Sequence, residues 1–127
     1  MIELIVKFIR FCIVGFSGLG IDFFTTWVLK DKVVLNKYFS NSCGFILAAS
    51  SNYYLNRIWT FNSINPDISK EFSVFLIVSV IGLVINNILL FIFHKKYNNN
   101  FYFAKIIAIF ITTIWNFLAN NFYTFAF

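Results

Sequence analysis

Polar side chains that could bind an anionic, sugar-bearing ligand gather near the ends of two apolar stretches. They are two asparagine pairs, an arginine and a tryptophan: Asn52, Asn56, Arg57, Trp59, Asn116 and Asn120. Asparagines four positions apart lie on one face of a helix, so each pair predicts a polar ladder. A guanidinium binds phosphate oxygens with a planar fork of donors, and amides bind phosphates or hydroxyls. The pattern predicts a phosphate and sugar site, with interfacial anchors and interhelical hydrogen bonds as the alternative.

A second set of polar residues lies deeper in the apolar stretches. Asp22 is the only acid well inside one of them, about 21 Å along a helix from Phe8. Asn86 lies at a similar depth in the third stretch. An ionisable residue at that depth indicates a functional role, and a hydrogen-bonded structural carboxyl is the alternative. Gly15 and Gly18 share the face of Asp22, which predicts close approach of another helix there.

The sequence contains no set of residues that is typical of catalysis. It has no Ser/His/acid arrangement, no metal-ligand spacing, no Gly-rich phosphate loop and no paired acids. His94 stands beside Lys95 and Lys96, which indicates a solvated residue at the end of a segment. We therefore predict that the protein is not an enzyme and uses neither a cofactor nor a metal.

The composition predicts a membrane protein. Of the 127 residues, 60% are hydrophobic and 12% are charged, and the mean hydropathy is +0.79. Soluble domains contain about 25% charged residues, and about 20 apolar residues cross a bilayer core. The chain therefore predicts one all-α integral membrane domain over residues 1–127. It should hold four transmembrane helices, at about 8–29, 39–59, 72–93 and 104–125.

The basic residues stand at the ends of these stretches. The net charge is +5, and this distribution predicts anchors among membrane lipids rather than a nucleic-acid surface. Arg10 stands at the start of the first stretch, and the second stretch returns to the same membrane face. We therefore expect Arg10 and Arg57 to lie at one face and to share the predicted phosphate site.

The two halves of the sequence match at a constant offset of 64 positions. The matched pairs are Gly18 and Gly82, Asp22 and Asn86, Asn52 and Asn116, Asn56 and Asn120, and Thr60 and Thr124. Each half contains two predicted spans, an even number. The pattern therefore predicts two parallel two-helix repeats related by an axis along the membrane normal. Arg10 and Arg57 have no basic counterpart, so we expect an asymmetric site.

Three motifs together cover nearly the whole chain. They are Phe8-x-x-Phe11-x-x-Val14-Gly15-x-x-Gly18-x-x-x-Asp22, Asn52-x-x-Leu55-Asn56-Arg57-x-Trp59-Thr60-Phe61 and Asn116-Phe117-x-x-Asn120-x-x-Tyr123-Thr124-Phe125. They resemble the GtrA-like family, small four-span bacterial membrane proteins encoded beside glycosyltransferases. The resemblance implies translocation of undecaprenyl-phosphate-linked sugar for cell-surface polysaccharide glycosylation, with a membrane glycosyltransferase as partner. Family members usually have a basic residue where this chain has Asn121.

Two other functions stay open from the sequence. The four spans could serve as a scaffold that anchors a partner glycosyltransferase. The chain could also be a small proton-coupled exporter, which depends on a membrane acid such as Asp22 but needs no asparagine ladder. Assembly into a homo-oligomer is a further open point.

The charge pattern and the resemblance disagree on topology. More lysines and arginines lie on the side of the two loops that follow the first and third stretches, which favours termini outside the cell. The resemblance implies a multi-pass protein of the cytoplasmic (inner) membrane with both termini in the cytoplasm, where the lipid-linked sugar is made. We follow the resemblance.

Overall fold

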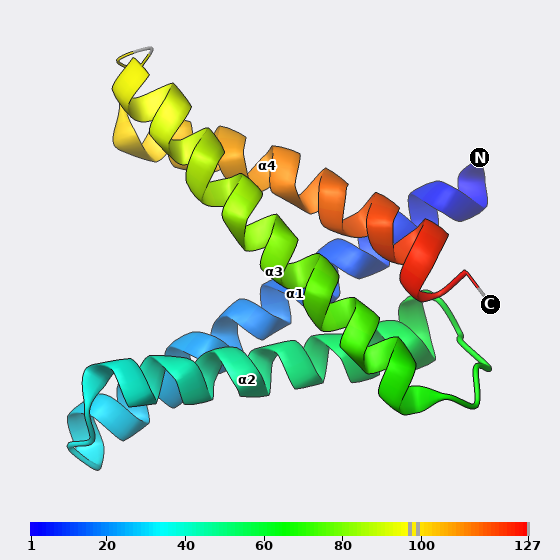
Figure 1. Ribbon diagram of the computed structural model, residues 1–127, viewed down its shortest axis with the longest axis horizontal. Helices are drawn as coiled ribbons and strands as arrows, with labels where there is room; N and C mark the ends of the chain where they lie inside the picture. Colours follow the sequence, from blue (N-terminus) through cyan, green and yellow to red (C-terminus); the bar gives the residue numbers. More distant parts are fainter. Residues whose placement is uncertain (97, 99, 127) are drawn as a thin grey trace. The chain divides into compact units, whose positions relative to one another are not determined.

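The computed structural model describes residues 1–96, 98 and 100–126, and for residues 37 and 38 the backbone alone. It contains four α-helices: α1 (Ile2–Trp27), α2 (Lys37–Leu55), α3 (Ile68–Phe91) and α4 (Phe101–Ala119) (Figure 1). Each continues into one π-helical turn: η1 (Val28–Lys32), η2 (Asn56–Thr60), η3 (Ile92–Lys96) and η4 (Asn120–Thr124). The described residues form no strand, which confirms the all-α prediction.

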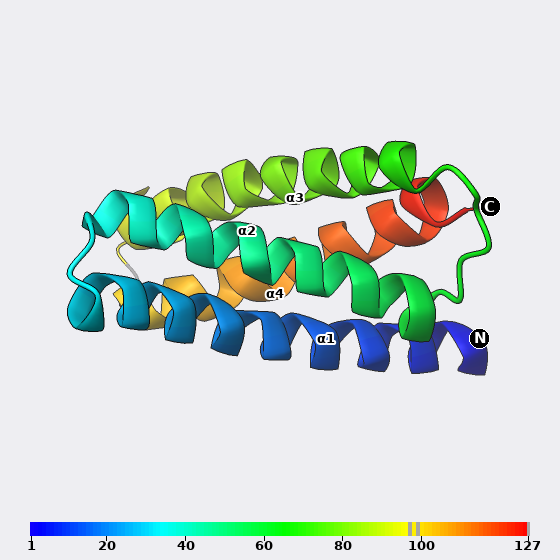
Figure 2. The same ribbon diagram turned by 90° about the horizontal axis from the view of Figure 1, so that it is seen from below.

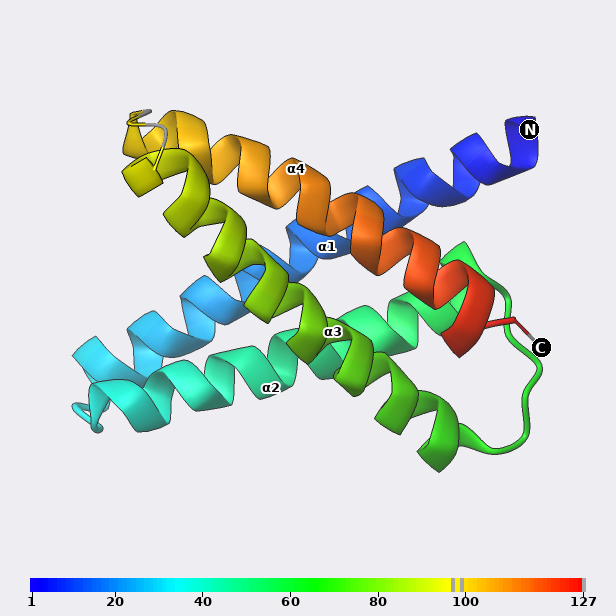
Figure 3. The ribbon, with the colours of Figure 1, turned by 45° about the horizontal axis from the view of Figure 1, so that its top comes forward.

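The helices form two compact units, Met1–Ser63 and Ile64–Phe127. We call them the first and the second hairpin. In the first hairpin α1 and α2 run antiparallel and pack against each other (Figure 2). In the second hairpin α3 and α4 do the same (Figure 3). The two halves defined by the sequence match are thus the two hairpins of the fold.

Three of the four helices are long and apolar enough to cross a membrane. With their π-helical turns they cover Ile2–Lys32, Ile68–Lys96 and Phe101–Thr124. The second helix is less apolar because serines and asparagines interrupt it: Ser40, Asn41, Ser42, Ser50, Ser51 and Asn52. Length and composition thus support three of the predicted spans, and the span at 39–59 stays a prediction.

Side-chain caps start α2, α3 and α4 a few residues before the predicted spans, whereas α1 begins at Ile2 without such a cap. Asp67 caps α3 by accepting a hydrogen bond from the backbone N–H of Lys70 at 3.1 Å. Asn100 caps α4 through the N–H of Tyr102 at 2.9 Å. Asn36 accepts similarly from the backbone at the start of α2. The first turns therefore contain polar residues that hydropathy alone leaves out.

Equivalent residues make the same contacts inside each hairpin. The rings of Phe11 and Phe61 lie 6.3 Å apart in the first hairpin, and those of Phe75 and Phe125 lie 6.2 Å apart in the second. These pairs differ by the offset of 64 positions found in the sequence. This ring contact of the first hairpin is therefore repeated in the second.

One residue between the two helices of each hairpin has the same unusual backbone conformation. Val34 and Asn98 both have left-handed backbones, with φ of 63° and 54°. Asparagine adopts this conformation readily, whereas for a β-branched residue it is an outlier. The left-handed backbone of Asn98 is thus also adopted at Val34, although the side chain of Val34 opposes it.

Candidate functional site

An arginine and a tryptophan meet where the first hairpin begins and ends. Arg10 Nη1 donates a hydrogen bond to the carbonyl oxygen of Trp59 at 3.1 Å. The guanidinium carbon of Arg10 also lies 5.3 Å from the centroid of the Trp59 ring, within cation–π range. The sequence placed both residues at one end of the hairpin, and the structure brings them into contact. Because a guanidinium has five N–H donors, this geometry orients the group without exhausting it.

A second guanidinium lies in the same π-helical turn as Trp59. Arg57 is half-buried, and its Nη1 donates to Ser63 Oγ at 3.3 Å. Arg10 and Arg57 therefore both belong to the end of the hairpin that holds Trp59. In the second hairpin the equivalent positions are Val74 and Asn121, which carry no charge. The two arginines of the predicted site thus have no charged equivalent in the second hairpin.

The second asparagine of each pair, Asn56 or Asn120, is buried where its helix ends. Asn56 is 2% exposed and Asn120 is 1% exposed. Each accepts a hydrogen bond at 2.7 Å from the threonine one turn later, Thr60 or Thr124. Their oxygens are therefore engaged within their own helices and hold the π-helical turns in shape. The first asparagine of each pair, Asn52 or Asn116, is therefore the stronger candidate for contact with a ligand.

Asn52 and Asn116 each pack against a glycine of the facing helix. A Cβ atom at Gly18 would come within 2.7 Å of Asn52 Nδ2, and one at Gly82 within 3.1 Å of Asn116 Cγ. The Oδ1 atoms of both asparagines are buried and have no hydrogen-bond partner among the described residues. A Cβ at Gly15 would meet nothing within 4 Å, so the predicted close approach occurs at Gly18 and not at Gly15.

Asp22 lies deeper in the first hairpin and packs against a glycine of α2. A Cβ atom at Gly44 would lie 2.5 Å from Asp22 Oδ1 and 2.8 Å from the Asp22 carbonyl oxygen. The half-buried carboxylate accepts a hydrogen bond from Thr26 Oγ1 at 3.3 Å. Sequence reasoning missed Thr26, although its spacing of one turn from Asp22 is a usable signal. Asn86 replaces Asp22 in the second hairpin, where its buried Oδ1 has no partner in the described part of the chain.

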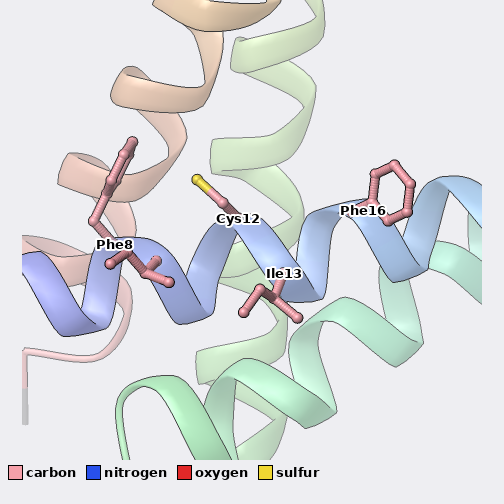
Figure 4. A pocket seen from close by; sticks show the side chains of 5 residues that line it. Phe8, Cys12, Ile13 and Phe16 are labelled. Atoms are coloured by element: carbon pink, nitrogen blue, oxygen red, sulfur yellow. The ribbon is translucent and has the colours of Figure 1, made fainter.

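An apolar hollow of about 330 Å³ lies along α1. Five side chains of that helix line it: Phe8, Ile9, Cys12, Ile13 and Phe16. Figure 4 shows the hollow from close by, with Phe8, Cys12, Ile13 and Phe16 labelled. None of these side chains carries a charge. The hollow therefore suits a hydrocarbon chain rather than a sugar or a phosphate.

Comparison with known families covers almost the entire chain. Residues 10–125 match the family model described as GtrA/DPMS, transmembrane domain. The chain belongs to this family. Among curated proteins no significant match was found. The membership, with the three apolar helices, identifies a multi-pass membrane protein of a family that handles polyprenyl-phosphate-linked sugars.

The match includes every residue of the predicted site. Arg10 is its first residue, and both asparagine pairs, at the ends of α2 and α4, lie within it. The resemblance seen in the sequence is thereby confirmed at the level of the family.

Proposed function

We propose that the protein moves undecaprenyl-phosphate-linked sugar across the cytoplasmic membrane for polysaccharide glycosylation. Family membership supports a general role with such lipids. The contact between Arg10 and Trp59 is the observation that carries the proposal further. It joins a donor group suited to phosphate with an aromatic ring suited to a sugar face, at one end of a membrane hairpin. No catalytic step is part of the proposal, and a membrane glycosyltransferase supplies the substrate.

The polar groups of the first hairpin form a series along its length. Arg10 and Arg57 would bind the phosphate at one end. Asn52 Oδ1, which is buried without a partner among the described residues, would accept a sugar hydroxyl farther along. Asp22 lies about 18 Å from Arg10 along α1. A polar headgroup is costly to place in hydrocarbon, and such a series lowers that cost.

The proposal includes the arrangement of the chain in the membrane. We propose that α2 crosses the membrane like the other three helices, so that the two hairpins act as parallel repeats. Both termini would then lie in the cytoplasm, where the lipid-linked sugar is made. Reporter fusions at positions 1 and 127 should report cytoplasm, and a fusion at Asn98 should report the outside. The reverse result would move the arginines to the wrong face for loading.

The function is tested by substitutions of Arg57. Lysine keeps the charge but loses the planar fork, so Arg57→Lys should retain part of the activity. Arg57→Ala should lower surface sugar by roughly tenfold or more, the effect of losing one charged hydrogen bond. Lys105→Ala removes an exposed cation from the second hairpin and serves as the control. Membrane levels of each variant are measured in parallel.

Two pools of sugar distinguish translocation from anchoring of a glycosyltransferase. A translocation defect raises the inner pool of sugar-charged carrier while surface sugar falls. A scaffold defect lowers both pools, because the partner enzyme then fails to load the carrier. Unchanged pools in Arg57→Ala would remove the phosphate site from the proposal.

A further inference from the structure

Three polar residues face one another at the interface between α3 and α4. Asn116 on α4 packs against Gly82 on α3. Asn86 follows Gly82 by one helical turn, and Thr112 precedes Asn116 by one turn. Because α3 and α4 are antiparallel, both turns lie on the same side of that contact. Asn86 and Thr112 therefore come opposite each other, one turn from Asn116.

Each of the three residues has a buried oxygen that the protein leaves unused. Asn86 Oδ1, Thr112 Oγ1 and Asn116 Oδ1 have no hydrogen-bond partner among the residues described. Thr112 is only 9% exposed. A threonine inside a helix normally bonds the carbonyl one turn earlier, as Thr113 does with Ile109 at 2.7 Å. The unused oxygens cost free energy unless something else binds them.

We propose that this interface binds one small monovalent cation, sodium, contrary to the expectation from the sequence that the protein uses no metal. The three groups supply oxygen lone pairs, which hard cations prefer. They carry no net charge, which suits a single positive charge better than two. Glycine is needed for Asn116 to fit against α3, so the interface is closely packed. A dehydrated sodium ion is smaller than either a water molecule or potassium, and a close-packed interface favours the smallest of the three.

The first hairpin provides an internal comparison. Its equivalents of Asn86, Thr112 and Asn116 are Asp22, Ala48 and Asn52. Alanine removes the middle oxygen, and the Asp22 carboxylate already accepts from a threonine on its own helix. The full set of unused oxygens therefore occurs in the second hairpin. Ala48 is 8% exposed, which shows that alanine fits this position of a packed hairpin. Thr112→Ala should therefore remove the site and keep the fold.

The test measures sodium binding to the purified full-length protein in lipid nanodiscs. Melting is followed by circular dichroism in equal concentrations of sodium, potassium or choline chloride. A cation that binds the folded state raises the melting temperature as its concentration increases. Sodium should raise it for the unmodified protein and for Thr113→Ala, whose hydroxyl is already bonded. The shift should be absent in Thr112→Ala. Radioactive sodium should bind at one ion per chain, with weak competition from potassium.

Three results would overturn the site. One is an equal melting temperature in all three salts. Another is an undiminished sodium shift in Thr112→Ala. The third is a lower melting temperature of Thr112→Ala in every salt, which indicates a bound water in place of the ion. Binding of radioactive sodium to the unmodified protein decides the question if Thr112→Ala fails to fold. None of these measurements uses the lipid-linked sugar, so their outcome is separate from that of the proposed function.

Discussion

Substitution of Gly44 by alanine should destabilise the first hairpin through one backbone contact. The added Cβ would lie 2.8 Å from the carbonyl oxygen of Asp22 on α1, closer than such atoms approach. It would also lie 2.5 Å from the side-chain oxygens of Asp22 and Thr26. The side chains can rotate away, but the carbonyl belongs to the helix backbone. Relief therefore requires α1 and α2 to separate.

The magnitude follows from two opposing effects. Overpacking a close contact costs about 1–3 kcal/mol. Replacing glycine by alanine within a helix returns up to about 1 kcal/mol. With the full helix gain subtracted, the net destabilisation of Gly44→Ala should be about 0–2 kcal/mol, which is about 1–3 kcal/mol relative to a glycine-to-alanine change without the clash. Gly15→Ala and Gly20→Ala gain the same helix propensity, and the added Cβ meets nothing within 4 Å. These two variants should be as stable as the unmodified protein or slightly more stable.

The comparison uses unfolding of the three variants in mixed micelles with increasing sodium dodecyl sulfate. Circular dichroism reports the helix content, and the midpoint ranks the stabilities. Gly44→Ala should unfold at the lowest detergent fraction. If its midpoint equalled that of Gly15→Ala, the close approach of α1 and α2 at this level would be refuted. Ala108, the equivalent of Gly44, is fully buried, so the second hairpin accommodates the methyl group that the first should reject.

Two further substitutions exploit differences between the hairpins. Val34 has a left-handed backbone, and asparagine stands at the equivalent position 98. Val34→Asn should therefore raise the free energy of unfolding by about 1 kcal/mol. An unchanged unfolding midpoint in the same micelles would contradict this. Asp22→Asn copies Asn86 and keeps an oxygen that accepts from Thr26. Its free energy of unfolding should therefore stay within about 0.5 kcal/mol of that of the unmodified protein, while surface sugar falls. Normal surface sugar in a well-expressed Asp22→Asn strain would make the carboxylate structural.

The sequence predicted the helices well because the membrane restricts the choices. Long apolar stretches leave α-helix as the structure that satisfies the backbone within one segment. The offset of 64 positions also identified equivalent residues, and the structure gives these equivalent contacts. The less apolar composition around Ser50 and Ser51 is the reason that one span is not supported as strongly as the others.

The details of the site were harder to predict because they depend on the facing helix. An asparagine pair at one-turn spacing predicts a shared face, but not which amide is used by its own helix. The structure shows that Asn56 is bonded to Thr60, whereas Asn52 packs against Gly18 with its oxygen unused. The unused hydroxyl of Thr112 was missed for the same reason. A threonine in an apolar helix looks identical in sequence whether or not it bonds its own backbone.

The division into hairpins has a consequence for how the protein is made. The contacts between helices described above join residues within 1–63 or within 64–127. Ribosomes add about 5–20 residues per second, so the second half takes roughly 3–13 s to emerge. Helical hairpins close far faster than that. The first hairpin can therefore pack Asp22 against Gly44, and Arg10 against Trp59, while the second is still being synthesised. Asp22 and Arg10, which are costly to expose to lipid, therefore have their contacts before the second hairpin is complete.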